Sequence, residues 1–390
     1  MDVRSVTATV AIAVAALLVP SATPAQNAPL KIGLVMKLSG TGASMARSVG
    51  ASIDAYFALH GGAVLGGRPA VIIRRDDTEV PDVGRRLAQE LIVQDKVDIL
   101  MGGTAAPEAV AIAEISTQAK VPYFIINATT PGILAKAPYA IRTAALAADL
   151  SPPLANWAVR NGIKNVYAVV ADYSTGRDKV AALTSALEAA GGKMIGSVAA
   201  PQLTTDFSSY MLRVRDAKPD AVFGFFGSAP GSINLIRQFG ITGLKATTKM
   251  LGGGDLTAEE LLAAEGDDAL GIVTVSNYTV DHDSKLNRDF VRAYRAAIAN
   301  PRPDDAPSFV DVQAYDALAA IDRAIGAQKG AIDADRTMEL LRGATFESPR
   351  GMISIDPQTR EVHQSIYIRR VERRNGRLVN AEIASFPPAK

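Results

Sequence analysis

Short apolar runs alternate with longer amphipathic stretches along most of the chain, and this alternation constrains the possible folds more than any other feature. Each apolar run has the length of a buried strand, and each amphipathic stretch carries apolar residues at helical spacing. Consecutive β-α units of this kind predict parallel sheets that are covered by helices on both faces. The predicted strands are Leu30 to Met36, Val71 to Ile73, Ile99 to Met101, Tyr123 to Ile126, Val166 to Val170, Met194 to Val198 and Ala221 to Phe226.

The alternation falls into two consecutive sets, which are separated near Ser151-Pro152-Pro153. The predicted helices are 47–59, 81–93 and 107–119 in the first set and 178–190, 207–217 and 233–239 in the second. The tail differs, with long helices at 284–299 and 310–325 and antiparallel strands at 352–355 and 366–371. We therefore predict an α/β protein with two doubly wound parallel-sheet lobes, for which 390 residues suffice.

The first 25 residues have the order of regions that is typical of a secretory signal peptide. Arg4 precedes an apolar run from Val10 to Val19, and a tail of small residues ends near Ala25. A run of about ten apolar residues is too short to cross about 30 Å of hydrocarbon. We therefore predict export, with residues 1–25 removed by cleavage near Ala25.

Composition excludes several classes of function. The chain has no Cys, which rules out disulfides, thiolate zinc sites, iron–sulfur clusters and Cys nucleophiles. Its 41 Lys and Arg residues balance 40 Asp and Glu residues, so nothing favours nucleic-acid binding. The three His residues are far apart, and no P-loop, dinucleotide-binding or nucleophile-elbow motif is present. We interpret Asp76-Asp77 as a turn and helix cap, and we expect no metal or other cofactor.

Three strand ends of the first set carry small and polar residues. They are Ser39-Gly40-Thr41, Gly102-Gly103-Thr104-Ala105-Ala106 and Asn127-Ala128-Thr129-Thr130. Ligands of open parallel sheets bind outside the carboxyl ends of the strands. The second and third clusters supply backbone N–H groups and hydroxyls near a helix start or a turn, which suits a carboxylate. The sequence therefore predicts a binding site at this edge of the first lobe.

Several segments resemble the periplasmic substrate-binding proteins of ABC transporters, in the branched-chain amino-acid (leucine-isoleucine-valine) class. These segments are 30–40 (LKIGLVMKLSG), 61–92 (GGAVLGGRPAVIIRRDDTEVPDVGRRLAQELI), 121–131 (VPYFIINATTP), 206–210, 218–223 and 347–356 (ESPRGMISID). The resemblance implies a type I periplasmic binding fold, in which two α/β lobes joined by three crossovers close on a small ligand. It also implies a monomeric, non-enzymatic periplasmic protein that delivers its ligand to a membrane permease with a cytoplasmic ATPase.

The resemblance also sets the predicted domain boundaries. The crossovers are expected near Arg142-Thr143, Val275-Asn277 and Ser348-Gly351. Lobe one then comprises residues 28–142 and 277–348, and lobe two comprises residues 143–276 and 349–390.

Ligand-binding residues are implied where positions match the family. The family holds the amino-acid carboxylate with the loops after the third and fourth strands, which correspond here to Thr104, Ala105 and Ala106 and to Asn127, Ala128 and Thr129. Thr129 matches the family threonine, whereas Ala106 stands where amino-acid binders usually have Ser, so only its N–H group can donate. Further polar candidates are Ser39 in lobe one and Ser228 in lobe two.

The lobe-two side departs from the family pattern. Amino-acid binders place an acidic residue after the strand that ends near Leu251, where this chain has Gly254 followed by Asp255. The family's first lobe-two tyrosine corresponds to Thr175, with Tyr173 nearby. An ammonium that loses its water without gaining a carboxylate partner is unfavourable by on the order of several kcal/mol. An α-amino acid is therefore a poor ligand unless Asp255 reaches it.

We therefore predict a binding protein for a small organic acid, with an aromatic or other apolar carboxylate as the expected ligand. Arg47 near the first cleft loop and Phe309 at a family pocket position are the predicted charge partner and apolar wall. The alternatives are a branched-chain amino-acid binder that uses Asp255, an amide or urea binder, a sensor that couples to a membrane receptor, and an enzyme on the same scaffold.

Overall fold

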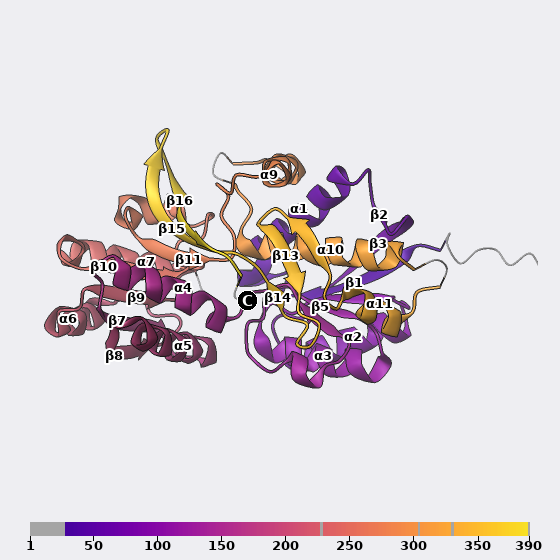
Figure 1. Cartoon of the computed structure of the whole chain (residues 1–390), viewed down its shortest axis with the longest axis horizontal. Helices are drawn as coiled ribbons and strands as arrows, with labels where there is room; N and C mark the ends of the chain where they lie inside the picture. The colour runs from indigo at the N-terminus through magenta and orange to yellow at the C-terminus, as the bar shows by residue number, and fades with distance from the viewer. Residues whose placement is uncertain (1–27, 227–228, 303–304, 329–330, 389–390) are drawn as a thin grey trace, which may run out of the picture.

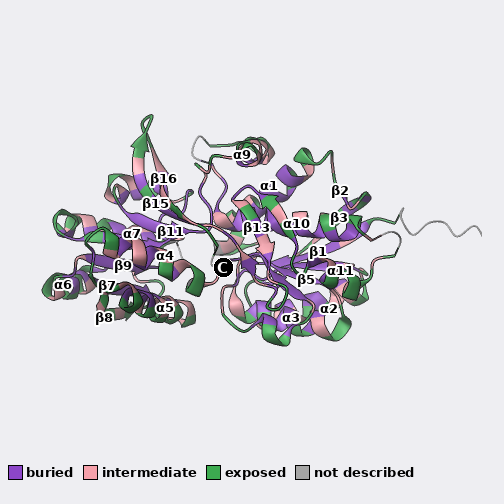
Figure 2. Ribbon diagram, viewed as in Figure 1, coloured by how far each residue is buried: buried purple, intermediate pink, exposed green. Residues whose placement is uncertain are grey.

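The computed structural model describes residues 28–226, 229–302, 305–328 and 331–388. The predicted signal peptide (1–25) and Ser228 lie outside these ranges. Figure 1 shows two lobes side by side, each built around its own sheet. Buried residues gather in the strands and on the inner faces of the helices, whereas the outer helix faces are exposed (Figure 2). The predicted fold class, two doubly wound parallel-sheet lobes, is confirmed.

The first lobe contains a six-stranded sheet with the order β2-β3-β1-β4-β5-β6. All neighbouring strands are parallel except β2 and β3. The register aligns Val35, Gly102 and Ile125, so the loops that follow β1, β4 and β5 leave the sheet at one edge. The strands are β1 (Leu30–Met36), β2 (Val64–Leu65), β3 (Arg68–Asp76), β4 (Ile99–Gly102), β5 (Tyr123–Ile125) and β6 (Ala140–Arg142).

Helices cover both faces of this sheet because its strands are apolar on both sides. Ile32 and Leu34 of β1 belong to a core with α1, α9 and α10, whereas Val35 belongs to a core on the opposite face with α2 and α3. The helices are α1 (Ala43–Leu59), α2 (Pro81–Val93), α3 (Ala106–Ala119), α9 (Lys285–Ala297), α10 (Phe309–Gly326) and α11 (Ala334–Leu341). The long helices of the tail therefore complete the first lobe.

The second lobe contains a seven-stranded sheet with the order β16-β15-β11-β10-β9-β7-β8. Its strands are β7 (Asn165–Ala171), β8 (Lys193–Ala200), β9 (Ala221–Phe225), β10 (Lys249–Gly253) and β11 (Val273–Ser276), which are parallel, and β15 (Ile366–Arg374) and β16 (Arg377–Phe386), which are antiparallel. One core holds Leu154 of α4 and Leu187 of α5, and the other holds Met211 of α6 and Leu235 of α7. The helices are α4 (Ala147–Arg160), α5 (Ser174–Ala190), α6 (Ser208–Ala217), α7 (Ala229–Ile241) and α8 (Leu262–Glu265).

Helix α4 corrects one sequence prediction, because the residues read as a break, Ser151-Pro152-Pro153, lie inside it. The helix begins upstream of the prolines, and the Asp149 carboxylate accepts a hydrogen bond from the Leu146 N–H at 3.2 Å. Each proline removes one helical N–H group, which disfavours a helix locally. Burial of Leu154 in the second-lobe core outweighs this local cost, as tertiary packing often does.

A small third sheet changes the predicted position of the last crossover. It consists of β12 (Thr345–Ser348), β13 (Gly351–Ile355) and β14 (Val362–His363). We expected residues from 349 onward in lobe two, but β13 pairs with β12 and Ile355 lies in a lobe-one core. The Arg360 guanidinium also donates to the Ala140 carbonyl at 3.1 Å. The last connection between the lobes therefore lies between β14 and β15, after residue 363.

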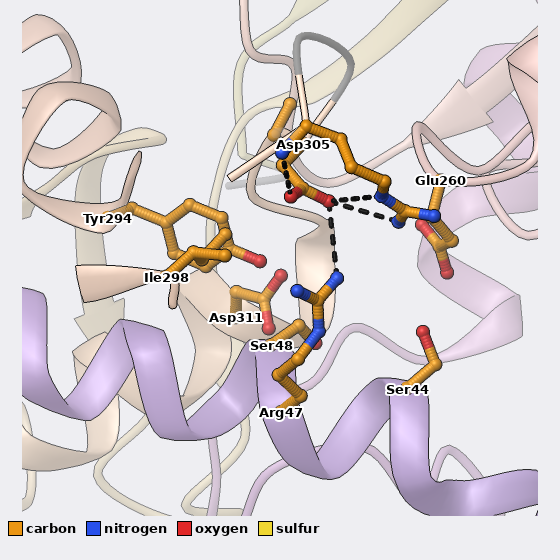
Figure 3. Close-up of a pocket in the computed structure, with 10 residues that line it drawn as sticks. Ser44, Arg47, Ser48, Glu260, Tyr294, Ile298, Asp305 and Asp311 are labelled. Atoms are coloured by element: carbon orange, nitrogen blue, oxygen red, sulfur yellow. Dashed lines mark hydrogen bonds and ion pairs between the residues drawn. The ribbon is translucent and has the colours of Figure 1, made fainter. Parts of the chain in front are cut away.

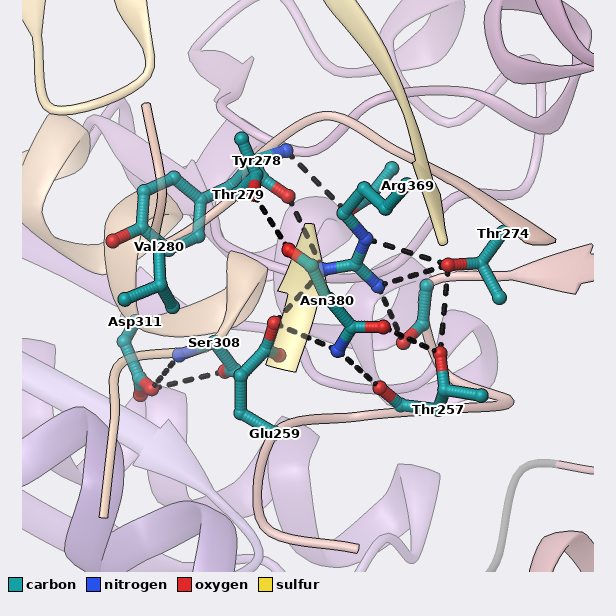
Figure 4. A network of polar contacts seen from close by, with 12 residues as sticks. Thr257, Glu259, Thr274, Tyr278, Thr279, Val280, Ser308, Asp311, Arg369 and Asn380 are labelled. Atoms are coloured by element: carbon teal, nitrogen blue, oxygen red, sulfur yellow. Dashed lines mark hydrogen bonds and ion pairs between the residues drawn. The ribbon is translucent and has the colours of Figure 1, made fainter. Parts of the chain in front are cut away.

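Fully buried arginines fix the connections between the lobes. Arg142, Arg350 and Arg369 each have no exposed surface. Arg350 forms an ion pair with Asp316 at 2.7 Å and donates to the Thr143 carbonyl, on the first connection, at 2.7 Å. Arg369 donates to Glu259 at 3.0 Å and to the Tyr278 carbonyl, on the second connection, at 3.3 Å (Figure 4). Arg142 lies 3.0 Å from Glu361 in the segment that precedes the third connection. Charge-assisted hydrogen bonds thus hold the backbone of the first two connections, and a side-chain ion pair lies beside the third.

Candidate ligand-binding site

The loops after β4 and β5 form one continuous surface at the carboxyl edge of the first sheet. The Ile126 and Ala128 N–H groups donate to the Gly102 and Gly103 carbonyls, both at 2.9 Å. The Asn127 side-chain amide donates to the Thr104 carbonyl at 3.0 Å. The buried Arg142 supports this surface from below, because its guanidinium donates to the Ala128 and Thr130 carbonyls at 2.9 Å. The two loops that the sequence singled out therefore lie together, and we call them the lobe-one cradle (residues 103–106 and 126–130).

The cradle offers fewer ligand donors than the sequence suggested. The Ala105 N–H and the Thr104 hydroxyl both donate to the Glu108 carboxylate, the latter at 3.3 Å. The Ala106 N–H, at the first position of α3, has no acceptor among the described residues, and neither does the half-buried Thr129 hydroxyl. The N-terminus of a helix favours negative charge. The Ala106 N–H and the Thr129 hydroxyl are therefore among the cradle donors that are open to an anion.

Two fully buried carboxyl groups, those of Asp77 and Glu108, lie beneath the cradle. Among the described residues, one oxygen of each has no hydrogen-bond partner, and the buried Tyr123 hydroxyl also has none. Burial, together with the charge of Asp77, raises the pKa of Glu108 to about 7. Gly103 has φ +72°, and a Cβ at this position would lie 2.2 Å from the Tyr123 hydroxyl oxygen. The cradle thus depends on a glycine directly above a buried polar cluster.

Asp76 and Asp77 act as turn caps, as the sequence indicated. Asp76 accepts hydrogen bonds from the Leu38 and Thr78 N–H groups at 3.0 Å, and Asp77 accepts from the Glu79 N–H at 2.9 Å. The Ser39 hydroxyl, followed by the Leu38 N–H, lowers the pKa of the Asp76 carboxyl by hydrogen bonding. Ser39 is therefore exposed at the cleft edge with its hydroxyl directed to Asp76.

The second lobe contributes a wall of four side chains at the carboxyl edge of its sheet. The rings of Tyr173 and Phe225 lie 5.8 Å apart. The Lys179 ammonium of α5 lies 4.6 Å from the centre of the Phe225 ring and 3.5 Å from the Asp255 carboxylate. We call Tyr173, Lys179, Phe225 and Asp255 the lobe-two wall. Its cation–π contact and ion pair fix the ammonium in one place.

Sequence reasoning missed Lys179, although the helical pattern contained a signal for it. Leu183 and Leu187 of α5 are buried against the second sheet, and Lys179 stands one turn before them on the same face. A lysine on the buried face of an amphipathic helix is unusual, because the charge must be paired or solvated. Its place near the start of a helix that follows a strand put it at the binding edge of the sheet.

A cavity with about 290 Å³ of empty space opens beside Lys179 in the second lobe. Its lining is almost entirely apolar and comprises Leu150, Leu154, Leu183, Phe223 and Val275, together with Ser151, Gly253 and Lys179. Such a mixture of apolar walls and a few placed polar groups is typical of sites for small organic ligands.

The structure separates the roles of Gly254 and Asp255. The Gly254 carbonyl accepts a hydrogen bond from the buried Arg369 at 3.2 Å, and a Cβ there would lie 2.8 Å from the Ser276 hydroxyl oxygen. Gly254 therefore faces the interior of lobe two, where an acidic side chain would not fit without rearrangement. Asp255 points instead toward Lys179, and only 22% of its side chain is exposed.

The wall of lobe two faces the first lobe. Burial raises the pKa of the Tyr173 hydroxyl, and the charges of Asp255 and of Glu79 add to this effect. Glu79 belongs to lobe one, where it forms an ion pair with Lys37 at 2.9 Å. Tyr173 therefore lies near carboxylates of both lobes.

The described contacts of Arg47 and Phe309 are with residues outside these two surfaces. Arg47 lines a separate polar cavity of about 360 Å³ of empty space and forms an ion pair with Asp305 at 3.3 Å (Figure 3). Glu260 of lobe two and Asp311 also line this cavity. Phe309 is half-buried against a lobe-one core at the start of α10. Arg47 is thus already paired with a carboxylate in this structure.

The described ranges contain no cluster of three or more His, Asp or Glu side chains that could hold a metal ion. The part of the chain that the structure describes also has no helix that is both long and apolar enough to span a bilayer.

The two lobes, their three connections and the polar groups at the facing sheet edges define a protein that holds a small ligand between two domains. Residues 29–377 match the family described as periplasmic binding protein, and the chain belongs to this family. It is therefore a solute-binding protein of the kind that serves ABC transporters, and it is not an enzyme.

The chain is similar to proteins of both ligand themes that the sequence left open. It is 38% identical to a "Leu/Ile/Val-binding protein homolog 6" of Brucella melitensis, over 92% of this chain and 91% of that protein. It is also 38% identical to a solute-binding protein of an ABC transporter from Rhodopseudomonas palustris that was solved in complex with 3,4-dihydroxybenzoic acid. The two structures superpose with a TM-score of 0.85 over 93% of this chain and 98% of that chain. A second Rhodopseudomonas palustris protein, solved with p-hydroxybenzoic acid, is 34% identical with a TM-score of 0.87 and the same coverage.

Proposed function

We propose that this protein binds, between its lobes, a small carboxylate that has an aromatic or other apolar body and no ammonium group. The observation that carries the proposal is the ion pair of Lys179 with Asp255, whose charged atoms lie 3.5 Å apart. Asp255 is the acid that an amino-acid ligand would need, and Lys179 already balances its charge. A ligand ammonium at this place would meet both charges and would gain little net attraction.

The rest of the site suits a carboxylate with an apolar body. The Ala106 N–H and the Thr129 hydroxyl of the lobe-one cradle are open donors beside a helix N-terminus, which stabilises an anion. The aromatic rings of the lobe-two wall and the apolar side chains that line the adjoining cavity offer apolar contacts to a ring. Two proteins that are 34% and 38% identical to this chain were solved with hydroxylated benzoic acids, which supports the same ligand class here.

Membership of the family supports a proposal for export and delivery of the ligand. On this proposal, residues 1–25 direct export and are removed, and the mature protein works as a monomer in the periplasm. It passes its ligand to the membrane permease of an ABC transporter, whose cytoplasmic ATPase drives uptake. N-terminal sequencing of the protein recovered from the periplasm tests the first step, and the expected first residue is Gln26.

A thermal-shift panel tests the ligand class. A ligand at about 100 times its dissociation constant stabilises the folded protein by about 2.7 kcal/mol, which is a readily measured shift. We expect stabilisation by benzoate-type and phenylpropanoid acids and no shift with leucine, isoleucine or valine. Shifts with the branched-chain amino acids and none with aromatic acids would overturn the proposal.

A branched-chain amino-acid binder is the second candidate, because the similar Brucella protein carries a Leu/Ile/Val-binding name. In this alternative, Lys179 leaves Asp255 when the ligand binds, and Asp255 takes the ammonium. Binding of leucine by the unmodified protein that is abolished in Asp255→Ala would establish this alternative.

A further inference from the structure

The Lys179–Asp255 pair is incomplete in a way that points to the ligand. One carboxylate oxygen of Asp255, Oδ1, lies 3.5 Å from the Lys179 ammonium. The other oxygen, Oδ2, is buried and has no hydrogen-bond donor among the described residues. A buried carboxylate oxygen without a donor is unfavourable, so this atom is suited to accept a hydrogen bond from a group that enters the site.

The surroundings restrict which group can complete the pair. A second ammonium is repelled by Lys179, and a second carboxylate is repelled by Asp255, since both charges are close. A hydroxyl group is neutral, donates one hydrogen bond and accepts others. It can therefore donate to Asp255 Oδ2 and accept from the Lys179 ammonium, which has three N–H groups, without introducing a like charge.

The neighbouring residues place this hydroxyl on a ring. The Lys179 ammonium lies 4.6 Å from the centre of the Phe225 ring, and Phe225 is in turn 5.8 Å from the ring of Tyr173. A group that reaches Lys179 and Asp255 thus passes beside aromatic surfaces and next to the apolar cavity. Gly253 gives it room, because a Cβ at this position would lie 2.3 Å from Asp255 Oδ1 and 3.1 Å from the Lys179 ammonium.

We infer that Lys179 and Asp255 form a hydroxyl-recognition subsite, so that the protein prefers aromatic carboxylates with a hydroxyl group on the ring, remote from the carboxylate, over those without one. The inference rests on the proposed function, in which the cradle of lobe one holds the carboxylate. It adds that two side chains of lobe two read the other end of the ligand.

Isothermal titration calorimetry with three benzoates tests the subsite. The probes are 4-hydroxybenzoate, 4-fluorobenzoate, which is similar in size but cannot donate, and 4-methoxybenzoate, which can only accept. Because a hydrogen bond to a charged group contributes about 1.5 to 3 kcal/mol, we expect 4-hydroxybenzoate to bind roughly 10- to 100-fold more tightly than either analogue.

Variants identify the groups responsible. The double variant Lys179→Met/Asp255→Leu removes both charges together, which avoids leaving one partly buried charge unpaired. We expect it to lose the preference for the hydroxyl, so that 4-hydroxybenzoate and 4-fluorobenzoate bind to it with affinities within about threefold of each other. Lys193→Gln, at an exposed position of lobe two, is the matched control and should keep the preference. Thermal unfolding verifies that each variant folds.

The possible outcomes distinguish failure of the hydroxyl-recognition subsite from failure of the proposed function. Equal affinities for the three benzoates in the unmodified protein, or an unchanged hydroxyl preference in the double variant, would overturn the subsite while leaving the proposed function intact. Binding of leucine with no binding of any benzoate would overturn the proposed function, and the inference would fail with it.

Discussion

The two halves of the binding site are built from different kinds of groups. The lobe-one cradle presents backbone N–H groups and a hydroxyl, and buried residues such as Arg142 and Glu108 hold its loops. The lobe-two wall presents the side chains of Lys179, Asp255 and two aromatic residues beside an apolar cavity. The cradle is therefore formed by the loop backbone of its lobe, whereas the wall is formed by side chains that can be replaced without changing the backbone.

This difference suggests a division of tasks. Backbone donors at a helix start recognise any carboxylate, and they cannot be changed by substitution without disturbing the loops that carry them. Side chains at the carboxyl edge of the lobe-two sheet can be substituted one at a time, so they can determine which carboxylate is preferred. A comparison of variants in the two halves should then separate stability from specificity.

The largest effect is expected from Arg142→Met in lobe one. This change removes a buried guanidinium that lies 3.0 Å from Glu361 and donates to the Ala128 and Thr130 carbonyls at 2.9 Å. Breaking one partner of a buried pair costs about 3 to 5 kcal/mol, so the free energy of unfolding should fall by about 3 kcal/mol. Chemical denaturation measures it, with the exposed Arg160→Met as the control. Loss of stability without weaker binding would contradict the coupling of cradle and fold.

A smaller loss is expected from Gly103→Ala. The added Cβ would lie 2.2 Å from the Tyr123 hydroxyl oxygen on a backbone with φ +72°. Strain of this kind costs about 1 to 3 kcal/mol. Gly132→Ala is the matched control, because its φ is +81° but no atom lies within 4 Å of the added Cβ. A thermal unfolding shift no larger than that of the control would show that the close contact is not important.

Lys179→Gln in the lobe-two wall should change specificity and should cost less stability than Arg142→Met. The side chains of the pair are 16% and 22% exposed, and the mostly buried Asp255 loses its partner, so the free energy of unfolding should fall by about 1 to 2 kcal/mol. Asp255 then loses its partner and can accept an ammonium, so the ratio of leucine to 4-hydroxybenzoate affinity should rise by roughly tenfold or more. Competition titrations measure this ratio, and an unchanged ratio would argue against Lys179 as a specificity residue.

The last effect concerns pH. Because burial raises the pKa of Glu108 to about 7, the folded protein binds this proton more tightly than the unfolded chain does. The resulting stabilisation is present at low pH and is lost as the pH rises from the ordinary glutamate range through about 7. Relative to Glu108→Gln, the unmodified protein should lose about 1 to 2 kcal/mol over this range. Glu114→Gln, on the exposed face of the same helix, serves as the control, and parallel pH profiles for all three proteins would refute the assignment.

Much of the fold could be predicted because burial imposes a sequence period. Apolar spacing predicted strands β1 and β7 and the long helices near the C-terminus. The spacing matches elements that are buried on two sides. The prediction failed where contacts between distant segments determine whether a helix continues or which strands pair. Pro152 and Pro153 look like a helix break, but packing keeps them in α4, and β13 has no sequence signal that favours β12 over a lobe-two partner.

The candidate site shows the same limit. Small and polar residues at strand ends identified the cradle, because the edge at which parallel strands end is fixed by the fold. Which donors stay open could not be predicted, since the Ala105 N–H is bonded to a carboxylate three residues along the helix. The partner of Asp255 also escaped prediction, because Lys179 comes from α5 and Asp255 from the turn after β10, and only the folded chain brings them to 3.5 Å.

The most direct test of this division of tasks is a crystal structure of the complex with 4-hydroxybenzoate. We expect the ligand carboxylate to lie within hydrogen-bond distance of the Ala106 N–H and the Thr129 hydroxyl. The ring hydroxyl should contact Asp255 Oδ2 and the Lys179 ammonium. A carboxylate bound to Lys179, with Asp255 displaced and the cradle unused, would contradict the account.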